Sequence, residues 1–247
     1  MDRMLYLAMS GAKETAYAQT LNNHNLANAS TTGFRAALTD AVTAEVRGPV
    51  FDSRDYVQTR TPGTDFSAGP LISTGNELDF AIDDRGFFAV LGPDGREAYT
   101  RSGQFQLDPF GQLRNERGFP VLGEAGAIAL PPFESLLIGR DGTISIVPAG
   151  GAPNQLVAVD RLRLVNPEPE QLIRGEDGLI RGVDEDVEFE NDALVRVNQG
   201  YLEGSNVNTV AALTRMIELS RHFETQVKLM DTADQLERQT TRLLGQS

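Results

Sequence analysis

The 247-residue sequence contains no cysteine and no tryptophan, and it has only two histidines. Without cysteine the chain forms no disulfide bond and offers no thiolate to a metal ion. The histidines, His24 and His222, are far apart in the sequence, and neither has a second histidine or carboxylate arranged around it as a ligand set. The sequence therefore predicts neither a bound metal ion nor a cofactor.

Long apolar runs and an excess of basic residues are also missing. No run reaches the roughly 18 residues of a membrane-spanning helix, so we expect a protein that is not membrane-embedded. Ser10, Gly11, Lys13 and Glu14 interrupt the N-terminal apolar stretch, so we expect no cleaved signal peptide. The formal charge is −13, and residues 37–204 carry 28 acidic and 14 basic side chains. This acidic region has no basic patch for phosphates, so we expect no nucleic-acid partner.

Motifs for catalysis are absent as well. Ser73 and Ser102 lie outside any nucleophile-elbow pattern, and no glycine-rich phosphate loop occurs. Abundant carboxylates leave a carbohydrate-processing enzyme with helical extensions as an alternative, although the aromatic content of 7% provides few platforms for sugars. The acidic run 184–192 lacks the spacing of a calcium-binding loop, and the alternation of Val187 and Phe189 predicts an edge strand. We therefore predict that the protein is not an enzyme.

The two ends of the chain are the most regular part of the sequence. Residues 1–28 contain no proline and one glycine, and residues 205–244 contain neither, which predicts a helix at each end. Both segments carry apolar and small residues at alternating spacings of three and four, typical of a helix that packs along another helix. The first stripe comprises Leu5, Ala8, Ala12, Thr15, Gln19, Asn22 and Leu26. The second comprises Ala212, Met216, Leu219, Phe223, Gln226, Met230, Ala233, Glu237, Thr240 and Leu244, widened by Leu213, Ile217, Val227, Leu236 and Leu243.

The region between the helices predicts β-structure. Residues 71–204 contain short runs of strand-forming residues separated by the turn signals Pro93-Asp94-Gly95, Asp108-Pro109-Phe110-Gly111, Arg140-Asp141-Gly142 and Glu176-Asp177-Gly178. Residues 37–70 contain several glycine–proline breaks, with Val50, Phe51, Tyr56 and Val57 as candidates for short strands, and they predict a connecting arm.

The predicted fold class is α+β, with a mainly-β central domain and terminal helices that pair into a coiled-coil-like helical domain. We expect residues 1–36 and 205–247 to form the terminal assembly domain, residues 37–70 the arm, and residues 71–204 the β-rich domain. Ser205, Asn206 and Asn208 are candidates for the cap of the second helix. A helix of about 37 residues extends about 55 Å, so we expect it to project from its domain and to need partners.

Three segments resemble the axial family of the bacterial flagellum, the rod and hook proteins. Residues 25–35, NLANASTTGFR, are similar to the family pattern N-L-A-N-x-x-T-x-G-[FY]-[KR]. Residues 199–208, QGYLEGSNVN, are similar to its C-terminal counterpart, G-x-L-E-x-S-N-V. The central segments 74–82, 86–88 and 99–103 resemble the core β domain of the family. The resemblance covers nearly the whole chain.

Within the family, residues 1–12 and 61–66 most resemble the proximal-rod members. The chain departs from the family patterns at Ala29-Ser30 and at Gly204. A distal-rod or hook-type axial protein is the alternative within the family. Outside it, the alternatives are the enzyme considered above and a scaffold or adhesin whose acidic β domain binds a partner.

The resemblance implies a structural subunit that self-assembles with other axial proteins into the tubular drive shaft that transmits motor torque across the periplasm. Its expected partners are further copies of the chain, the rod proteins above and below it, and the flagellar type III export apparatus, which exports its substrates without a cleaved signal peptide. The expected location is the basal body, in the periplasmic rod. The expected assembly interface comprises Leu5, Ala8, Ala12, Asn25, Asn28, Thr32, Gly33, Phe34, Ser205, Asn206, Val207, Met216, Leu219, Phe223, Met230 and Leu236.

Overall fold

The chain folds into two compact units of different character. The computed structural model describes residues 2–38, 41–47, 52–59, 63–150, 155–175, 177–184 and 187–244. The helical unit comprises Met1–Ala29, Ala36–Asp65 and Val207–Ser247, and the β-rich unit comprises Ser30–Arg35 and Phe66–Asn206. Both predicted terminal helices and the predicted central strands are present, so the α+β class is confirmed.

The units divide the chain differently from the predicted boundaries at residues 30–35, in the predicted arm, and at residues 205–206, which belong to the β-rich unit. Residues 30–35, expected with the terminal helices, belong to the β-rich unit, because the Gly33 amide donates to the Glu203 carbonyl at 2.8 Å. The predicted arm, residues 37–70, is divided between the two units. Residues 37–65 belong to the helical unit, because strand β3 (Asp52–Thr59) lies against helix α1 (Asp2–Ala27), and residues 66–70 belong to the β-rich unit. The differences at residues 30–35 and 37–65 arise from contacts between residues far apart in sequence.

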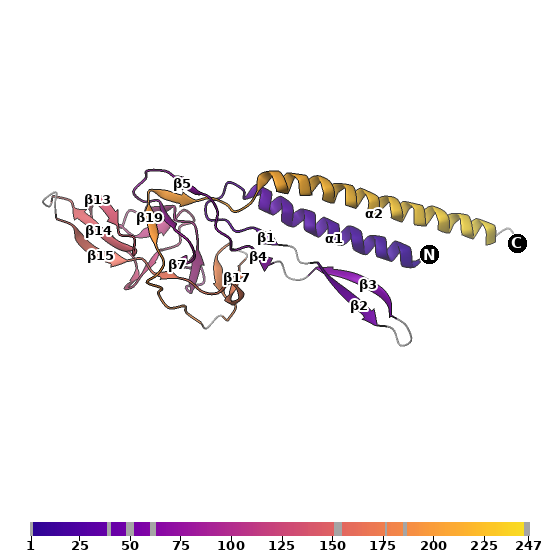
Figure 1. Ribbon diagram of the computed structural model, residues 1–247, viewed down its shortest axis with the longest axis horizontal. Helices are drawn as coiled ribbons and strands as arrows, with labels where there is room; N and C mark the ends of the chain where they lie inside the picture. The colour runs from indigo at the N-terminus through magenta and orange to yellow at the C-terminus, as the bar shows by residue number, and fades with distance from the viewer. Residues whose placement is uncertain are drawn as a thin grey trace. The chain divides into compact units, whose positions relative to one another are not determined.

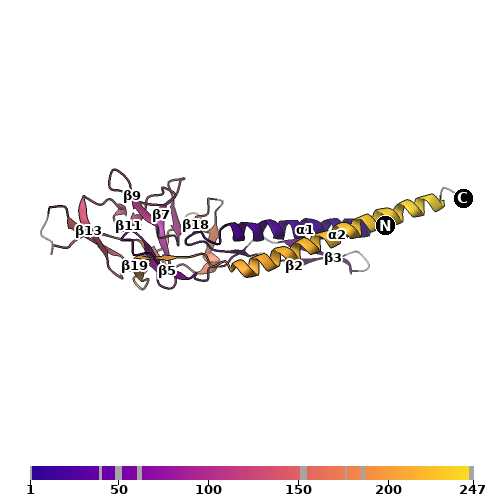
Figure 2. The same ribbon diagram turned by 90° about the horizontal axis from the view of Figure 1, so that it is seen from above.

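In the helical unit, α1 and α2 (Thr209–Leu244) lie side by side and run in opposite directions (Figures 1 and 2). Gly11 lies against the Gln226 side chain, and Asn22 bonds to the Ala212 carbonyl. Helix α2 begins as predicted after an asparagine, because the Asn208 Oδ1 accepts a hydrogen bond from the Ala211 amide at 3.0 Å.

Two short antiparallel pairs complete the helical unit. Strand β2 (Ala41–Arg47) pairs with β3, and β1 (Ala37–Leu38) pairs with β4 (Gly63–Thr64). The strand expected at Tyr56 and Val57 is confirmed as part of β3. Val50 and Phe51, and the start of segment 61–66, lie outside the described residues.

The β-rich unit contains one five-stranded sheet, one three-stranded sheet and four strand pairs. Its described strand pairings are all antiparallel, as expected for strands joined by tight turns. The five-stranded sheet has the order β16-β7-β8-β18-β17, the three-stranded sheet is β13-β14-β15, and the pairs are β5-β20, β6-β19, β9-β10 and β11-β12. The strands are β5 (Leu71–Ser73), β6 (Phe80–Ile82), β7 (Phe87–Leu91), β8 (Glu97–Thr100), β9 (Phe105–Leu107), β10 (Leu113–Asn115), β11 (Leu122–Gly123), β12 (Gly126–Ala127), β13 (Phe133–Ile138), β14 (Thr143–Pro148), β15 (Val157–Arg161), β16 (Leu164–Val165), β17 (Leu172–Arg174), β18 (Ile180–Gly182), β19 (Val197–Gln199) and β20 (Tyr201–Glu203), with a 3₁₀ turn, η1 (Pro169–Gln171), before β17.

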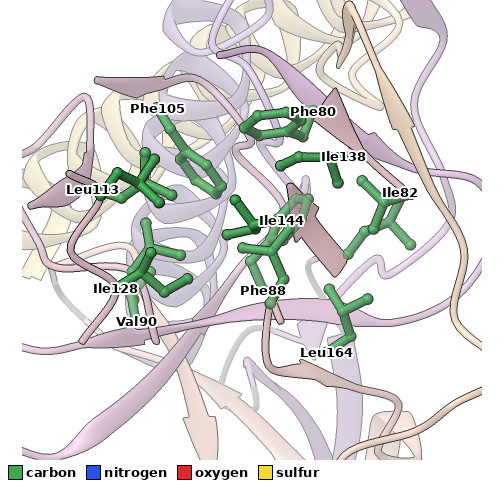
Figure 3. Packing of buried hydrophobic residues seen from close by; sticks show 14 of the residues in the cluster. Phe80, Ile82, Phe88, Val90, Phe105, Leu113, Ile128, Ile138, Ile144 and Leu164 are labelled. Atoms are coloured by element: carbon green, nitrogen blue, oxygen red, sulfur yellow. The ribbon is translucent and has the colours of Figure 1, made fainter. Parts of the chain in front are cut away.

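The core of the β-rich unit lies where the inward faces of several small sheets meet. Figure 3 shows aromatic rings and branched aliphatic side chains from β6, β7, β9, β10, β13 and β14 packed together. The rings of Phe80 and Phe88 lie 5.4 and 5.2 Å from that of Phe105, within the range of favourable aromatic pairs. A smaller cluster on the other side of the five-stranded sheet includes Tyr99, which packs on Phe189.

The four turn signals form the connections that the sequence predicts. Gly95, Gly111, Gly142 and Gly178 all adopt φ between 74° and 83°, and each lies between two paired antiparallel strands. The aspartate of each turn accepts a backbone hydrogen bond from the residue two positions later. These bonds favour the charged carboxylate and contribute to the lowered pKa of Asp94, Asp108, Asp141 and Asp177.

Acid should weaken these turns, and Asp177 provides the test. Hydrogen bonds from Arg181 at 2.9 and 2.6 Å, followed by that from the Leu179 amide, lower its pKa. A carboxyl group with a pKa below the unfolded value of about 3.9 adds stability above that value, and loses it as the pH falls through the folded pKa. We expect Asp177→Asn to unfold at lower urea than the native chain at pH 7, with the difference shrinking toward pH 2.5. A difference independent of pH would contradict this account.

The acidic run 184–192 is not the edge strand that its alternation predicts. Its described part, residue 184 and residues 187–192, has no strand assignment. The Asn191 side chain accepts a hydrogen bond from the Leu164 amide, and the Asp192 amide donates to the Leu164 carbonyl. These bonds to β16 replace a continuous ladder, so residues 187–192 are an irregular segment that contacts the sheet through Asn191 and Asp192. Among the described residues, no group of three acidic or histidine side chains is placed to hold a metal ion.

Candidate assembly surface

The seam between α1 and α2 is lined by small side chains. Ala8 and Ala12 of α1 are buried, as are Ala212 and Ala233 of α2, and Ala233 is only 3% exposed. A methyl group added at Gly11 would lie 3.1 Å from the Gln226 side chain. Small residues at these positions let the two helices approach closely, as the stripes predict.

The large apolar side chains of the two helices remain mostly at the surface. Val210 is 72% exposed, Ile217 54% and Phe223 38%. The exposed set on α1 is Leu5, Tyr6, Leu7, Met9 and Tyr17, and that on α2 is Val210, Leu213, Ile217, Phe223, Val227, Leu229 and Leu236. We call this set the exposed apolar face; contiguous exposed apolar surface is typical of interaction sites.

Toward its C-terminal end α1 uses asparagines in place of apolar contacts. The Asn22 side chain is buried and donates to the Ala212 carbonyl at 2.9 Å. The Asn25 side chain forms two 2.8 Å bonds with the backbone of Ala37, and the Asn28 side chain donates to the His24 carbonyl. These bonds fix how the chain enters and leaves the helix.

Replacing Asn22 by alanine should destabilise the helix pair by about 1 kcal/mol, because one buried hydrogen bond is lost. Urea unfolding followed by circular dichroism at 222 nm measures the change. The neighbouring Asn23 is exposed, so Asn23→Ala provides the matched control and should have almost no effect. Equal effects of the two substitutions would show that the bond to Ala212 does not hold the helices together.

In the β-rich unit, the two segments that resemble the family patterns meet. The Gly33 amide donates to the Glu203 carbonyl, and the Asn206 amide donates to the Phe34 carbonyl. Gly33 has φ +65°, and a Cβ there would lie 2.3 Å from the Ser102 amide nitrogen, so a side chain at this position is excluded. The sequence around Gly33 is thus explained by its contact with the segments around Ser102 and Glu203.

Glu203 joins these segments through buried charges. Its carboxylate accepts bonds from Arg35 at 2.7 Å, from Arg101 at 2.6 Å and from the Gly69 amide at 2.8 Å. The side chains of Arg35, Arg101 and Glu203 are 1–3% exposed. Burial lowers the pKa of Arg101, while Glu203 opposes this change, and an arginine starts so far above neutrality that it remains charged.

Arg174 completes the cluster. Its guanidinium lies 4.4 Å from the centre of the Phe34 ring and donates to the Arg35 carbonyl at 2.9 Å. Burial, followed by the nearby charge of Arg117, lowers the pKa of Arg174. The cluster therefore concentrates positive charge in a unit whose sequence is acidic overall.

The sixteen predicted interface residues fall into two groups. In the helical unit, Ala8 and Ala12 are buried in the seam, Met216, Leu219 and Met230 are half-buried, and Leu5, Phe223 and Leu236 are exposed. Asn25 and Asn28 bond to nearby backbone, and Val207 precedes α2. Thr32, Gly33, Phe34, Ser205 and Asn206 belong to the β-rich unit and are partly or fully buried in it. Contact with other subunits stays a prediction for all sixteen.

Sequence reasoning missed the charge cluster. Arg35, Arg101 and Glu203 each occur in a segment quoted for the family resemblance, but nothing in the sequence indicates that their side chains meet. Glu203 follows the buried strand residue Leu202, and in an alternating strand the next side chain faces the opposite way. The pattern therefore gives no indication that Glu203 is buried. One feature of the sequence could have indicated the cluster: each of the three motifs, although far apart in the sequence, contains a charged residue.

Two regions of the chain match known families. Residues 198–243 match the flagellar basal body rod FlgEFG protein C-terminal family, and residues 81–146 match the flagellar hook protein FlgE/F/G D1 domain. The fold and these matches define the class of flagellar rod and hook proteins.

Full-length relatives narrow the assignment. The flagellar basal-body rod protein FlgF of Escherichia coli (strain K12) is 41% identical over 252 residues, and that of Salmonella typhimurium (strain LT2) is 40% identical over 253 residues, each with complete coverage of both chains. A flagellar basal-body rod protein FlgG of Buchnera aphidicola is 32% identical, with 97% of this chain and 98% of the relative covered. The chain belongs to the family of the flagellar basal-body rod protein FlgF.

The family assignment confirms the prediction of a structural protein and does not support the enzyme alternative. The higher identity to FlgF than to FlgG also favours the proximal-rod resemblance over the distal-rod alternative. Neither described helix contains a stretch apolar enough to span a bilayer.

Proposed function

We propose that this chain is a structural subunit of the flagellar basal-body rod, and that it self-assembles with other axial proteins into the drive shaft that transmits motor torque across the periplasm. The family assignment supports a place in the basal body, and the exposed apolar residues of the helical unit support a role of its helices in assembly. The rod proteins above and below it and further copies of the chain are the partners, and the flagellar type III apparatus exports it.

The observation that carries the proposal is the distribution of side-chain size on the two helices. Their seam takes alanines and a glycine, while leucines, tyrosines, isoleucine and phenylalanine remain exposed. Burial of apolar surface is worth about 25 cal/mol per Å², so neighbouring subunits that cover the exposed apolar face gain a substantial driving force. A helix pair that closed on itself would place these side chains in its seam.

We infer that α1 and α2 pair in a coiled-coil-like manner, and that the exposed apolar face contacts helices of neighbouring subunits. The alternating spacing and the close approach at Gly11 support this pairing. Contacts between two different surfaces of identical or related subunits continue as an open helix when the rotation between them does not close a ring. In a tube built in this way, the helices of neighbouring subunits pack on one another. Each subunit also contributes its β-rich unit to the tube.

The test is complementation of a strain that lacks the corresponding gene. Full-length chain should restore swimming and copurify with basal bodies, whereas a chain without residues 1–36 and 205–247 should do neither. Immunoblots of purified basal bodies measure incorporation, and blots of whole cells control for expression. A truncated chain that is incorporated normally would exclude the helices as the assembly element, and a full-length chain absent from basal bodies would exclude the function.

A further inference from the structure

Arg35 of the β-rich unit has hydrogen-bond donors that its known partner does not use. Its Nη2 bonds to Glu203, but its Nε and Nη1 find no hydrogen-bond partner within the described part of the chain. The residue is only 3% exposed. An arginine presents its donors in a planar fork that matches a carboxylate, and leaving such donors unmet in a buried place is costly.

The unused donors belong to an arginine that lines a small cavity. The cavity has a volume of about 40 Å³ and lies within the β-rich unit, bounded by Arg35, Arg101, Arg117, Arg174, Thr32 and Ser102. A buried water needs about 10–15 Å³, so the cavity has room for three heavy atoms, the number in a carboxylate group. The hydroxyls of Thr32 and Ser102 form a 3.0 Å hydrogen bond with each other at its wall, which leaves one hydroxyl proton for a bound group.

The charge balance of the cavity is positive. Glu203 neutralises one of the two arginines that it bridges. Arg174 contributes a second positive charge, and within the described part of the chain its contacts are the neutral Phe34 ring and the Arg35 carbonyl. Arg117 at the cavity donates to the Asp177 carbonyl and brings a third. Among the described residues that line the cavity, Glu116 is the acidic one, and its side chain is exposed.

We propose that this arginine-lined cavity binds the carboxylate side chain of an aspartate or glutamate from a second copy of this chain. The cavity offers positive charge, buried guanidinium donors and the volume of one carboxylate group. Residues 37–204 carry 28 acidic side chains against 14 basic ones, so a neighbouring copy presents many suitable groups. The partner in this proposal rests on the proposed assembly function, whereas the carboxylate site itself does not.

The first experiment tests the site on the full-length chain, with formate as the probe. Arginine side chains labelled with ¹⁵N are observed by NMR while sodium formate replaces sodium chloride at constant ionic strength. We expect the Nε–H signals of Arg35 and Arg174 to shift and saturate with a dissociation constant of about 1–10 mM, the range open to a ligand of three heavy atoms. The exposed Arg196 should not respond. Absence of a formate-specific shift at Arg35 would overturn the proposal, because water alone then satisfies the cavity.

Variants link the NMR response to charge in the cavity. Arg174→Met retains apolar cover on Phe34 and removes the charge, and we expect at least a tenfold weaker formate response at Arg35. Arg196→Met is the matched control and should leave the response unchanged. If Arg174→Met lowers the melting temperature by more than a few degrees, Arg117→Met replaces it, since Arg117 is exposed. Unchanged formate affinity in a folded cavity variant would contradict the assignment.

The second experiment identifies the partner in purified basal bodies. A carbodiimide couples an amine directly to a carboxylate in contact with it, so the chain carrying Arg174→Lys is incorporated, treated and analysed by mass spectrometry. We expect a cross-link from the introduced lysine to an aspartate or glutamate of another copy, recognised by mixing isotopically light and heavy chains. A cross-link only to Glu116 or Glu203 of the same chain, or to a different axial protein, or no cross-link, would overturn the proposed partner. Normal incorporation without the cross-link would refute the partner while leaving the rod function standing.

Discussion

Replacing Glu203 by glutamine is expected to lower the free energy of unfolding of the β-rich unit by about 3–5 kcal/mol. Glutamine has nearly the same size as glutamate, so the change removes the charge and leaves the packing. Arg35 and Arg101 would then be two buried cations that have lost the carboxylate bonded to both of them, and removing one partner of a buried ion pair costs about this much. Equilibrium urea unfolding of the full-length chain, followed by fluorescence of its tyrosines, measures the change.

The control for this prediction is Glu134→Gln. Glu134 lies in β13 and is exposed, so its substitution should change the free energy of unfolding by less than about 0.5 kcal/mol. A second comparison, the pair Arg101→Met and Glu203→Gln together, should restore part of the loss, because fewer unpaired buried charges remain. An effect of Glu203→Gln as small as that of the control would mean that Glu203 does not hold residues 33–35, 69 and 101 together.

The second large effect is expected at the exposed apolar face. Phe223→Asp should reduce incorporation of the chain into basal bodies at least tenfold and abolish swimming, while the β-rich unit stays folded. The Phe223 side chain is 38% exposed on α2, so much of its apolar surface is left for a neighbour to cover. Placing a charged aspartate in an apolar contact costs several kcal/mol. Immunoblots of basal bodies and swimming in soft agar measure the outcome.

Thr225→Asp provides the matched control. Thr225 lies two residues away on the same helix, is exposed, and its hydroxyl bonds to the Arg221 carbonyl within the helix. The substitution introduces the same charge at a polar position, so incorporation should fall by less than about twofold. Met230→Asp, in the half-buried part of the second stripe, should behave like Phe223→Asp. Normal motility of the Phe223 variant would show that this face is not an interface between subunits.

Local sequence predicted the elements of this fold well. Helices α1 and α2 follow from continuous 3,4 spacing, and the cap at Asn208 follows from asparagine chemistry. The hairpins follow from their Asp and Gly residues, because both determine the local backbone. The order of strands in the five-stranded sheet was not predictable, since it depends on pairings such as β16 with β7 that join distant segments.

In the candidate site too, local features were predictable from the sequence and contacts between distant segments were not. Ala8, Ala12 and Asn22 of the first predicted stripe are buried, whereas Leu5 of the same stripe and Phe223 of the second are exposed. That residues 30–35 fold with the β-rich unit was not predicted, because the bond from Gly33 to Glu203 spans most of the sequence. The acidic run 184–192 was misjudged because alternation alone does not supply a strand partner. The motifs of the sequence include Arg35, Arg101 and Glu203. That these three side chains are in contact became visible only in the three-dimensional structure.

The hydrogen bond from Asn22 to Ala212 joins residues separated by 190 positions. The ribosome synthesises α1 before α2, so the two helices pair only after translation has passed residue 209. A chain that lacks either segment therefore cannot form the helix pair.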